Sequence, residues 1–157
     1  MSLSIIATIP LSYYTLDTIT PQQDKLMKKL INVDNVYNYD YLGFTNCVTH
    51  NGVIYITGQA GIDAQGNLVG PGIKEQAVKT FENIQTILEA AGASLADILA
   101  MTCFIVDIEK NGPDFFTTRA KMMPVNSFTS ASIGISKLAM PGLLVEVQCT
   151  AALPHTA

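Results

Sequence analysis

Residues 127–148 read SFTSASIGISKLAMPGLLVEVQ, two apolar runs on either side of a tight Met-Pro-Gly turn. Side chains of a strand point alternately to the two faces of a sheet. The second run therefore places Val145 and Val147 on one face and Glu146 on the other. In the first run the same alternation separates alanine and isoleucine from a face of serine and glycine that begins at Ser130. We predict a β-hairpin whose polar face holds Glu146 opposite small side chains, either as open sheet in solvent or as the floor of a cleft.

The segments that precede this hairpin predict a second hairpin and a helix. Residues 44–60 read FTNCVTHNGVIYITGQA, and an Asn-Gly pair between apolar runs is a strong hairpin signal. A brief strand is expected over residues 67–69. From Ile73 to Ala91 apolar residues recur every three or four positions, and Gly92 follows. This spacing predicts an amphipathic helix that ends at the glycine.

A strand and a shorter helix complete the predicted fold. Residues 101–106 are almost continuously apolar, which is typical of a central strand covered on both faces. Residues 113–123 predict a second helix with Pro113 near its first turn. The order β-β-(β)-α-β-α-β-β predicts an α+β fold, a two-layer sandwich of a mixed β-sheet with two helices on one face.

The composition predicts that this domain associates with copies of itself. Charged residues make up 14% of the chain and apolar residues 48%, whereas soluble domains typically have about 25% charged residues. Two helices leave one face of the sheet uncovered, and that face is too apolar for water. Large exposed apolar patches usually mark interfaces, so self-association is the simplest explanation.

The charge pattern and residue usage also exclude several classes of partner and site. The formal net charge is −4, and no basic cluster exceeds Lys28 and Lys29. Nucleic acid is therefore not expected as a partner. No apolar run approaches the ~18 residues of a membrane span, so no membrane association is expected. The two histidines, His50 and His155, form no zinc-ligand spacing with cysteine, and we predict neither a metal site nor another cofactor.

The cysteines and the chain ends bear on compartment and domain organisation. Cys47, Cys103 and Cys149 are far apart in apolar runs, which indicates reduced, buried thiols rather than a disulfide framework. With no clear signal peptide, these features predict a cytoplasmic protein. We divide the chain into an N-terminal extension, residues 1–25, and a single domain, residues 26–157.

No nucleophile elbow, P-loop or dinucleotide fingerprint is present, but three residues are candidates for a functional site. Glu146 would have a raised pKa in a desolvated cleft and could act as a general acid or position water, or it is simply a solvated carboxylate. Gly58 follows an apolar strand, where a missing Cβ lets a ligand approach or marks a bulge. Arg119 is either a solvated helix residue or a guanidinium that reaches a carboxylate across a subunit boundary.

The order of elements and three separate motifs resemble the Rid family, also called the YjgF or endoribonuclease L-PSP family. The motifs are VIYITGQAGID, ENIQTILEAAGASLADI and SIGISKLAMPGLLVEVQCTAAL, and the similarity runs from about residue 29 to residue 153. The resemblance implies a chorismate-mutase-like fold and a homotrimer with small-molecule clefts between subunits. Members of the RidA branch hydrolyse reactive enamines and imines to ketoacids and ammonia without a metal or organic cofactor.

The family's site residues carry over only in part. The glutamate that orients or activates water falls on Glu146, and the glycine of the cleft falls on Gly58. The tyrosine falls on Phe44, which keeps the ring and loses the hydroxyl. The arginine that holds the substrate carboxylate falls on Ser130, and an asparagine of the cleft falls on Arg119. Because a bidentate guanidinium binds a carboxylate more strongly than a neutral hydroxyl does, we expect the deamination of α-imino acids to be weak or absent unless Arg119 supplies the charge.

Three functions therefore compete on the sequence alone. The first is a Rid-like hydrolase in which Glu146 positions water, with Gly58, Ser130, Arg119 and Phe44 as the substrate-binding residues. The second is a non-catalytic trimer that binds a metabolite or a protein in the same cleft. The third is an endoribonuclease, against which the acidic charge and the lack of a suitable histidine argue.

Overall fold

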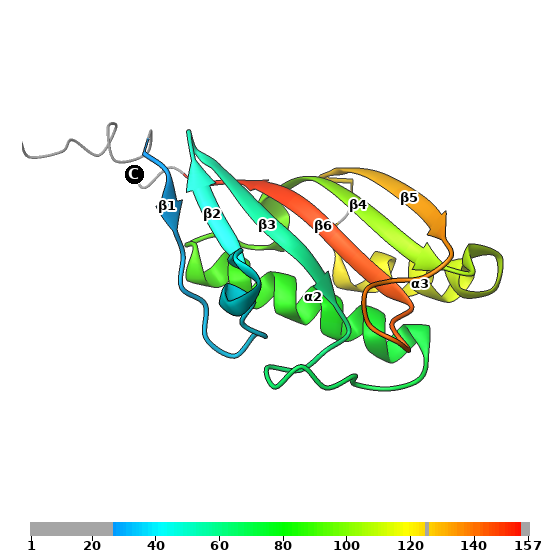
Figure 1. The fold of residues 1–157 in the computed structure, drawn as a ribbon. Helices are drawn as coiled ribbons and strands as arrows, with labels where there is room; N and C mark the ends of the chain where they lie inside the picture. Colours follow the sequence, from blue (N-terminus) through cyan, green and yellow to red (C-terminus); the bar gives the residue numbers. More distant parts are fainter. Residues whose placement is uncertain (1–26, 125, 155–157) are drawn as a thin grey trace, which may run out of the picture.

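A twisted, mixed β-sheet forms one layer of the molecule, and two helices form the other (Figure 1). The computed structural model describes residues 27–124 and 126–154. Within these residues the strands are β1 (Lys29–Leu30), β2 (Cys47–His50), β3 (Val53–Ala60), β4 (Ile98–Val106), β5 (Thr129–Ile135) and β6 (Val145–Ala152). The helices are α2 (Ile73–Ala90) and α3 (Ile108–Met122), with short 3-10 turns η2 (Asp40–Leu42) and η3 (Leu95–Asp97). The predicted two-layer α+β architecture is confirmed.

The strand order is β1-β2-β3-β6-β4-β5, so β4 lies between the two strands of the predicted C-terminal hairpin. The hairpin prediction is wrong: β5 pairs with β4 in parallel, and β6 pairs with β3 and β4 antiparallel. The nearly continuous apolar sequence of β4 explains this, because such a strand favours an interior position with a partner strand on each side. The loop between β5 and β6 consequently passes across the end of β4 instead of forming a tight turn.

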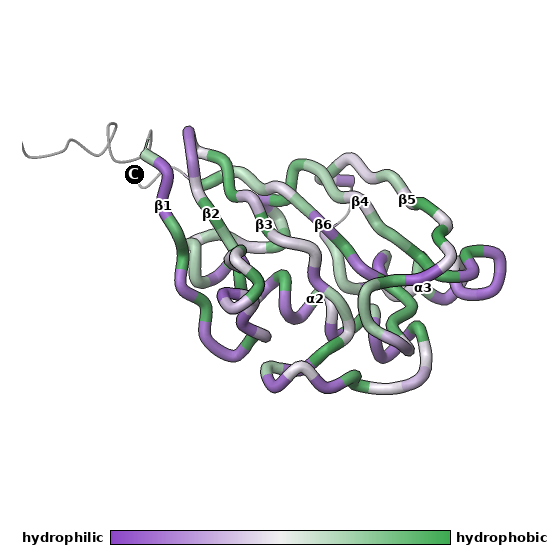
Figure 2. The backbone as a smooth tube through the Cα atoms, in the orientation of Figure 1, coloured by the Kyte–Doolittle hydropathy of each residue, from purple (hydrophilic) through white to green (hydrophobic). Residues whose placement is uncertain are grey.

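The core lies between the helices and one face of the sheet. The buried side chains of β6 are Val145, Val147, Cys149 and Ala151, and those of α2 include Ala77, Phe81, Ile84 and Leu88. Their spacing is two residues along the strand and three or four along the helix, as predicted from the sequence. Figure 2 shows the matching change between hydrophobic and hydrophilic residues along β6. The alternation therefore decides which face of β6 enters the core and leaves Glu146 on the other face.

Two local predictions are corrected by the structure. Helix α3 begins at Ile108, five residues before the predicted start at Pro113, so that Pro113 lies inside the helix. Asp107 precedes the helix with φ of 49°, a left-handed conformation that turns the chain directly from β4 into α3. Around residues 67–69 only an isolated bridge forms, between Ile62 and Leu68. The predicted extension, residues 1–25, lies outside the described residues.

Candidate functional site

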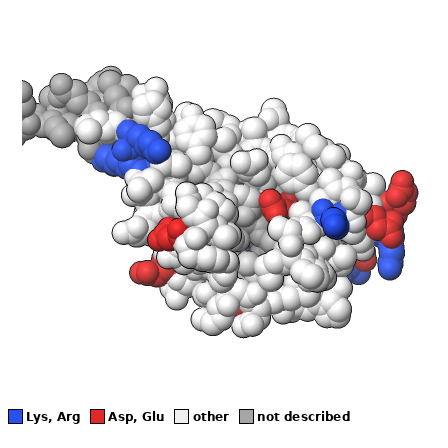
Figure 3. All heavy atoms as spheres, in the orientation of Figure 1, with Lys and Arg blue, Asp and Glu red and all other residues white. Residues whose placement is uncertain are grey.

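Glu146 lies on the uncovered face of the sheet, in the middle of β6. Its strand neighbours are Ala60 of β3 and Phe104 of β4, rather than the serines of β5 that the predicted hairpin would have placed there. The side chain is half-buried, and within the described residues its carboxylate makes no hydrogen bond or ion pair. Figure 3 shows acidic atoms over β6 on a face that otherwise carries few charges. Burial raises the pKa of Glu146 above its ordinary value.

A β-bulge in β3 makes room for this carboxylate. The pairing of β3 with β6 shifts between Ile56 and Gln59, which leaves Gly58 in the irregular segment. A Cβ atom on Gly58 would overlap Oε1 of Glu146. After the bulge, Gln59 turns into the core, where its Nε2 donates to Oδ1 of Asn46 at 3.2 Å. The bulge interpretation of Gly58 is confirmed, and the carboxylate of Glu146 occupies the space left by the missing Cβ.

Aromatic side chains border the Glu146 position on the β3 side. Phe44 is 44% exposed and stacks on Tyr39, with ring centroids 5.1 Å apart. Tyr39 also packs against the small apolar cluster that contains Ala60, the strand neighbour of Glu146. Burial, and secondly the negative charge of Glu146, raise the pKa of Tyr39 to about 12. Sequence reasoning missed Tyr39, because it lies in an irregular segment whose position depends on tertiary packing.

Arg119 and Ser130 form a second cluster at the other edge of the sheet. Nη1 of Arg119 donates to Oγ of Ser130 at 2.9 Å and to Oγ of Ser132 at 3.5 Å. Nη1 also lies 3.9 Å from Sγ of Cys103. Because Ser130 and Ser132 pair in register with the buried residues Met101 and Cys103 of β4, they point toward the helical layer. The cluster therefore lies on the face of the sheet opposite to Glu146.

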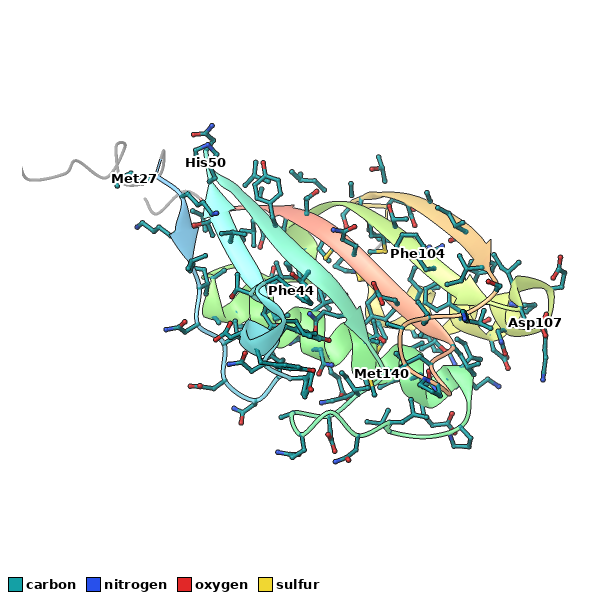
Figure 4. The ribbon with its side chains drawn as sticks, viewed as in Figure 1. Met27, Phe44, His50, Phe104, Asp107 and Met140 are labelled. Carbon is teal, nitrogen blue, oxygen red and sulfur yellow. The ribbon has the colours of Figure 1, made fainter. Side chains whose placement is uncertain are left out.

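The structure thus divides the predicted site residues into two groups. Glu146, Gly58 and Phe44 lie on the uncovered face, whereas Arg119 and Ser130 lie beneath β5 on the helical side. The prediction that Glu146 faces the serines is wrong for a single chain, since β4 separates β5 from β6. Figure 4 shows Phe44 beside the start of β2 and Met140 on the loop before β6.

The uncovered face and the β5 edge carry apolar groups in contact with solvent. Every residue of β5 except Ile135 is exposed, and Ile133 is 43% exposed. Tyr55 of β3 is 45% exposed on the same face as Glu146. An open edge strand beside an apolar face is a surface that proteins normally cover.

The cysteines and the described surface limit other interpretations. Cys47, Cys103 and Cys149 are buried and form no disulfide, as the sequence predicts. In residues 27–124 and 126–154, no three histidine, cysteine, aspartate or glutamate side chains are grouped to hold a metal ion. In the same part of the chain, no helix has the length and apolar character needed to cross a membrane.

The raised pKa of Glu146 predicts how the thermal stability of the variant Glu146→Gln, relative to wild type, depends on pH. A carboxyl group whose pKa is raised by folding destabilises the folded state relative to the unfolded chain. The effect is absent below the ordinary pKa, grows as the pH rises from the ordinary pKa to the raised one, and is fully present above the raised pKa. We expect the Tm of Glu146→Gln to rise relative to wild type between about pH 4 and pH 7. Differential scanning fluorimetry across this range measures the difference. Glu109→Gln, on the exposed first turn of α3, is the matched control for the same chemical change at the surface. A Tm difference for Glu146→Gln that is flat or falls with pH would contradict the prediction.

The two-layer fold, with two helices on one face of a mixed sheet, is the fold that the sequence resemblance implies. The model of the family described as Endoribonuclease L-PSP matches residues 40–153, which is most of the chain. This chain belongs to that family, also called the YjgF or Rid family.

Two relatives show the range of similarity. Protein mmf2, mitochondrial, of Schizosaccharomyces pombe is 31% identical over 114 residues, which are 69% of this chain and 86% of that protein. The 2-iminobutanoate/2-iminopropanoate deaminase of Bos taurus is 38% identical over 66 residues, 41% of this chain and 48% of the enzyme. Several curated relatives, among them a RutC family protein of Aquifex aeolicus, are matched over about half of their length.

Solved structures confirm the fold. RidA from the Antarctic bacterium Psychrobacter sp. PAMC 21119 superimposes with a TM-score of 0.72 at 26% identity, covering 79% of this chain and 98% of that one.

The predicted cytoplasmic location is wrong in the light of these relatives. Both mmf2 and the Saccharomyces cerevisiae protein MMF1, each matched over 86% of its own length, are mitochondrial proteins. The prediction rested in part on the lack of a clear signal peptide, which does not distinguish the cytoplasm from an organelle.

Proposed function

We propose that this chain is a cofactor-free hydrolase of enamines or imines that derive from amino acids, and that it acts in clefts between the subunits of a homotrimer. The observation that carries the proposal is the position of Glu146, half-buried beside Gly58 on an apolar face. Family membership and the deaminase name of the bovine relative support the same reaction class.

The chemistry requires one group that exchanges a proton with water. Glu146 accepts a proton from a water molecule as the water oxygen bonds to the carbon of the protonated imine, which gives a carbinolamine. The carboxyl group then returns this proton to the nitrogen. As the C–N bond breaks, ammonia leaves, the hydroxyl proton passes to solvent and the C=O bond of the ketoacid forms. A carboxyl group whose pKa is raised by burial suits both steps, because its two protonation states are closer in free energy near neutral pH. We assign to the backbone N–H of Gly58 a hydrogen bond to an oxygen atom of the substrate.

The division of the site into two groups supports an assembly. Arg119 and Ser130 cannot contact a substrate held by Glu146 of the same chain, because the sheet separates them. In a ring of identical subunits, the β5 edge of one copy can approach the uncovered face of the next, and such head-to-tail contacts close into a trimer. Static light scattering tests this directly, and a mass of about 51 kDa, three times the 16.9 kDa chain, is the expected result.

The test of activity is a coupled assay. An amino-acid oxidase generates imines from several amino acids in the presence of the protein, and ketoacid formation is compared with the uncatalysed rate. Acceleration for at least one imine supports the hydrolase. No acceleration, alongside a working bovine deaminase, would reject the hydrolase and favour the alternative, a non-catalytic trimer that binds a metabolite or a protein in the cleft.

The alternative has one specific observation in its favour. Two polar groups of the family pattern are missing, since Phe44 has no hydroxyl and Ser130 has no charge. A phenol is nevertheless present in the same region, because Tyr39 stacks on Phe44. Only the description of the family points to an endoribonuclease. His50 lies at the end of β2, away from Phe44 (Figure 4), and His155 lies outside the described residues.

A further inference from the structure

Arg119 is held rigidly at the β5 edge. It lies in the last turn of α3, and its guanidinium carbon is 5.7 Å from the ring centroid of Phe115 and 5.4 Å from that of Phe116. Its Nη1 donates to Oγ of Ser130 and to Oγ of Ser132. Aromatic contacts on one side and hydroxyl groups on the other fix the plane of the guanidinium. A fixed plane lowers the entropic cost of binding a ligand.

Part of the guanidinium makes no contact with a side chain in the described residues. The guanidinium carries five N–H groups, and the contacts to side chains in the described residues all involve Nη1. None of the described carboxylates lies within ion-pair distance of it, and the ion pairs found there join lysines to Asp114 and Glu82. A half-buried guanidinium without a counter-charge favours an anion with two oxygens in one plane.

We infer that Arg119 binds the carboxylate of the substrate and so determines its specificity, an inference that rests on the proposed function. Position 130 contributes a neutral hydroxyl that orients the guanidinium, and the positive charge at this edge comes from the helix. In the proposed trimer, Arg119 of one subunit faces Glu146 of the next, so that one end of a small imino acid contacts the guanidinium and the other the glutamate. Imines that carry a carboxylate are therefore preferred to neutral imines of the same shape.

Binding experiments test this inference separately from catalysis. Isothermal titration calorimetry with 2-oxobutanoate and with its neutral amide measures affinity for the carboxylate without requiring turnover. We expect Arg119→Met, which keeps the contact with the phenylalanines, to weaken 2-oxobutanoate binding by about tenfold to a hundredfold and to leave amide binding unchanged. Arg119→Lys should show about half of that loss of affinity on a logarithmic scale, because the positive charge remains and the planar pair of N–H donors is lost. Lys121→Met is the matched control, since Lys121 is exposed on the same turn of α3, and it should bind like wild type.

The outcomes distinguish the two proposals. Equal 2-oxobutanoate affinity in Arg119→Met and wild type would overturn the inference, as would a wild-type protein that binds the carboxylate no better than the amide. A lower Tm in Arg119→Met and in Ser130→Ala, with the preference for the carboxylate intact, would make Arg119 a structural tether and overturn it too. If the carboxylate binds through Arg119 and no imine is hydrolysed, the proposed function fails and this inference stands.

A mixed assembly tests whether the two residues meet across subunits. Co-expression of Glu146→Gln with Arg119→Met produces rings in which about a quarter of the clefts pair an intact Glu146 with an intact Arg119 from the neighbouring copy. At low imine concentration, turnover should exceed that of either variant alone. Turnover equal to the average of the two variants would contradict the shared site.

Discussion

Replacing Glu146 with glutamine is expected to reduce imine hydrolysis by about a hundredfold or more while the fold remains intact, because general acid–base groups typically contribute 10² to 10⁴ in rate. Glutamine has the shape of glutamate and fits beside Gly58, but it cannot take a proton from water. The measurement is ketoacid formation in the coupled oxidase assay, with the variant and wild type at equal concentration. The effect should appear in kcat more than in KM, since the glutamate acts on water rather than on the substrate's carboxylate.

Glu109→Gln is again the control for this experiment, because Glu109 is exposed at the start of α3 and away from both clusters. It should retain full activity. Unchanged turnover in Glu146→Gln would reject the hydrolase mechanism proposed for this site. A loss of turnover together with a changed molecular mass would show that the carboxylate acts on assembly instead.

Replacing Gln76 with methionine is expected to have the largest effect on stability at a single polar side chain. Gln76 is fully buried in the first turns of α2, and its Nε2 donates to the carbonyl oxygens of Gly70 and Gly142, both at 2.9 Å. Its Oε1 accepts from the backbone N–H of Leu144 at 2.8 Å. Methionine fills a similar volume and leaves these three backbone groups unpaired, which should cost about 3 kcal/mol or more.

The thermal midpoint measures this cost. For a chain of this size a loss of about 3 kcal/mol lowers Tm by roughly 6 to 12 °C. Gln85→Met is the matched control on α2, because Gln85 is exposed and bonds only to Glu89 one turn away; its Tm should fall by no more than about 2 °C. Equal shifts in the two variants would mean that the buried hydrogen bonds of Gln76 do not hold the loop.

The role of Gln76 also explains how β6 is positioned. Leu144 and Gly142 belong to the loop that leads into β6, two to four residues before Glu146. A single side chain of α2 thus ties together the loop after β3, the start of the helix and the entry to the strand that carries the candidate catalytic carboxylate. Below its melting transition, Gln76→Met should still show reduced turnover, because Glu146 is then less precisely held.

Much of the fold was predictable from local pattern, and the errors have identifiable physical causes. The period of two in residues 144–151 predicts correctly which face of β6 is buried, and the helical period after Ile73 predicts α2 to within two residues. The predicted start of the second helix was late because Pro113 was taken as a first-turn signal, whereas the turn into α3 occurs at Asp107. The proline lies in the interior of the helix, at the cost of one backbone hydrogen bond.

The candidate site was predictable as a set of residues but not as an arrangement. Glu146 and Gly58 were identified from strand position, and the structure brings them into contact. Arg119 was identified from its helix position and Ser130 from the resemblance, and their hydrogen bond was not foreseen. Tyr39 and Gln76 were missed, because neither stands in a periodic pattern that reveals its partners.

By itself the sequence determined the secondary structure, the buried faces and the family. It also identified Glu146 as a carboxylate within an otherwise apolar strand. Each of these depends on side chains that lie close together along the chain. Only the tertiary structure decided that β4 enters between β5 and β6, and hence that Glu146 and Arg119 lie on opposite faces of one sheet. The physical reason is that strand order depends on long-range competition for the interior positions of the sheet. The nearly continuous apolar strand β4 takes an interior position with a partner strand on each side, and no local pattern indicates which two strands those partners are.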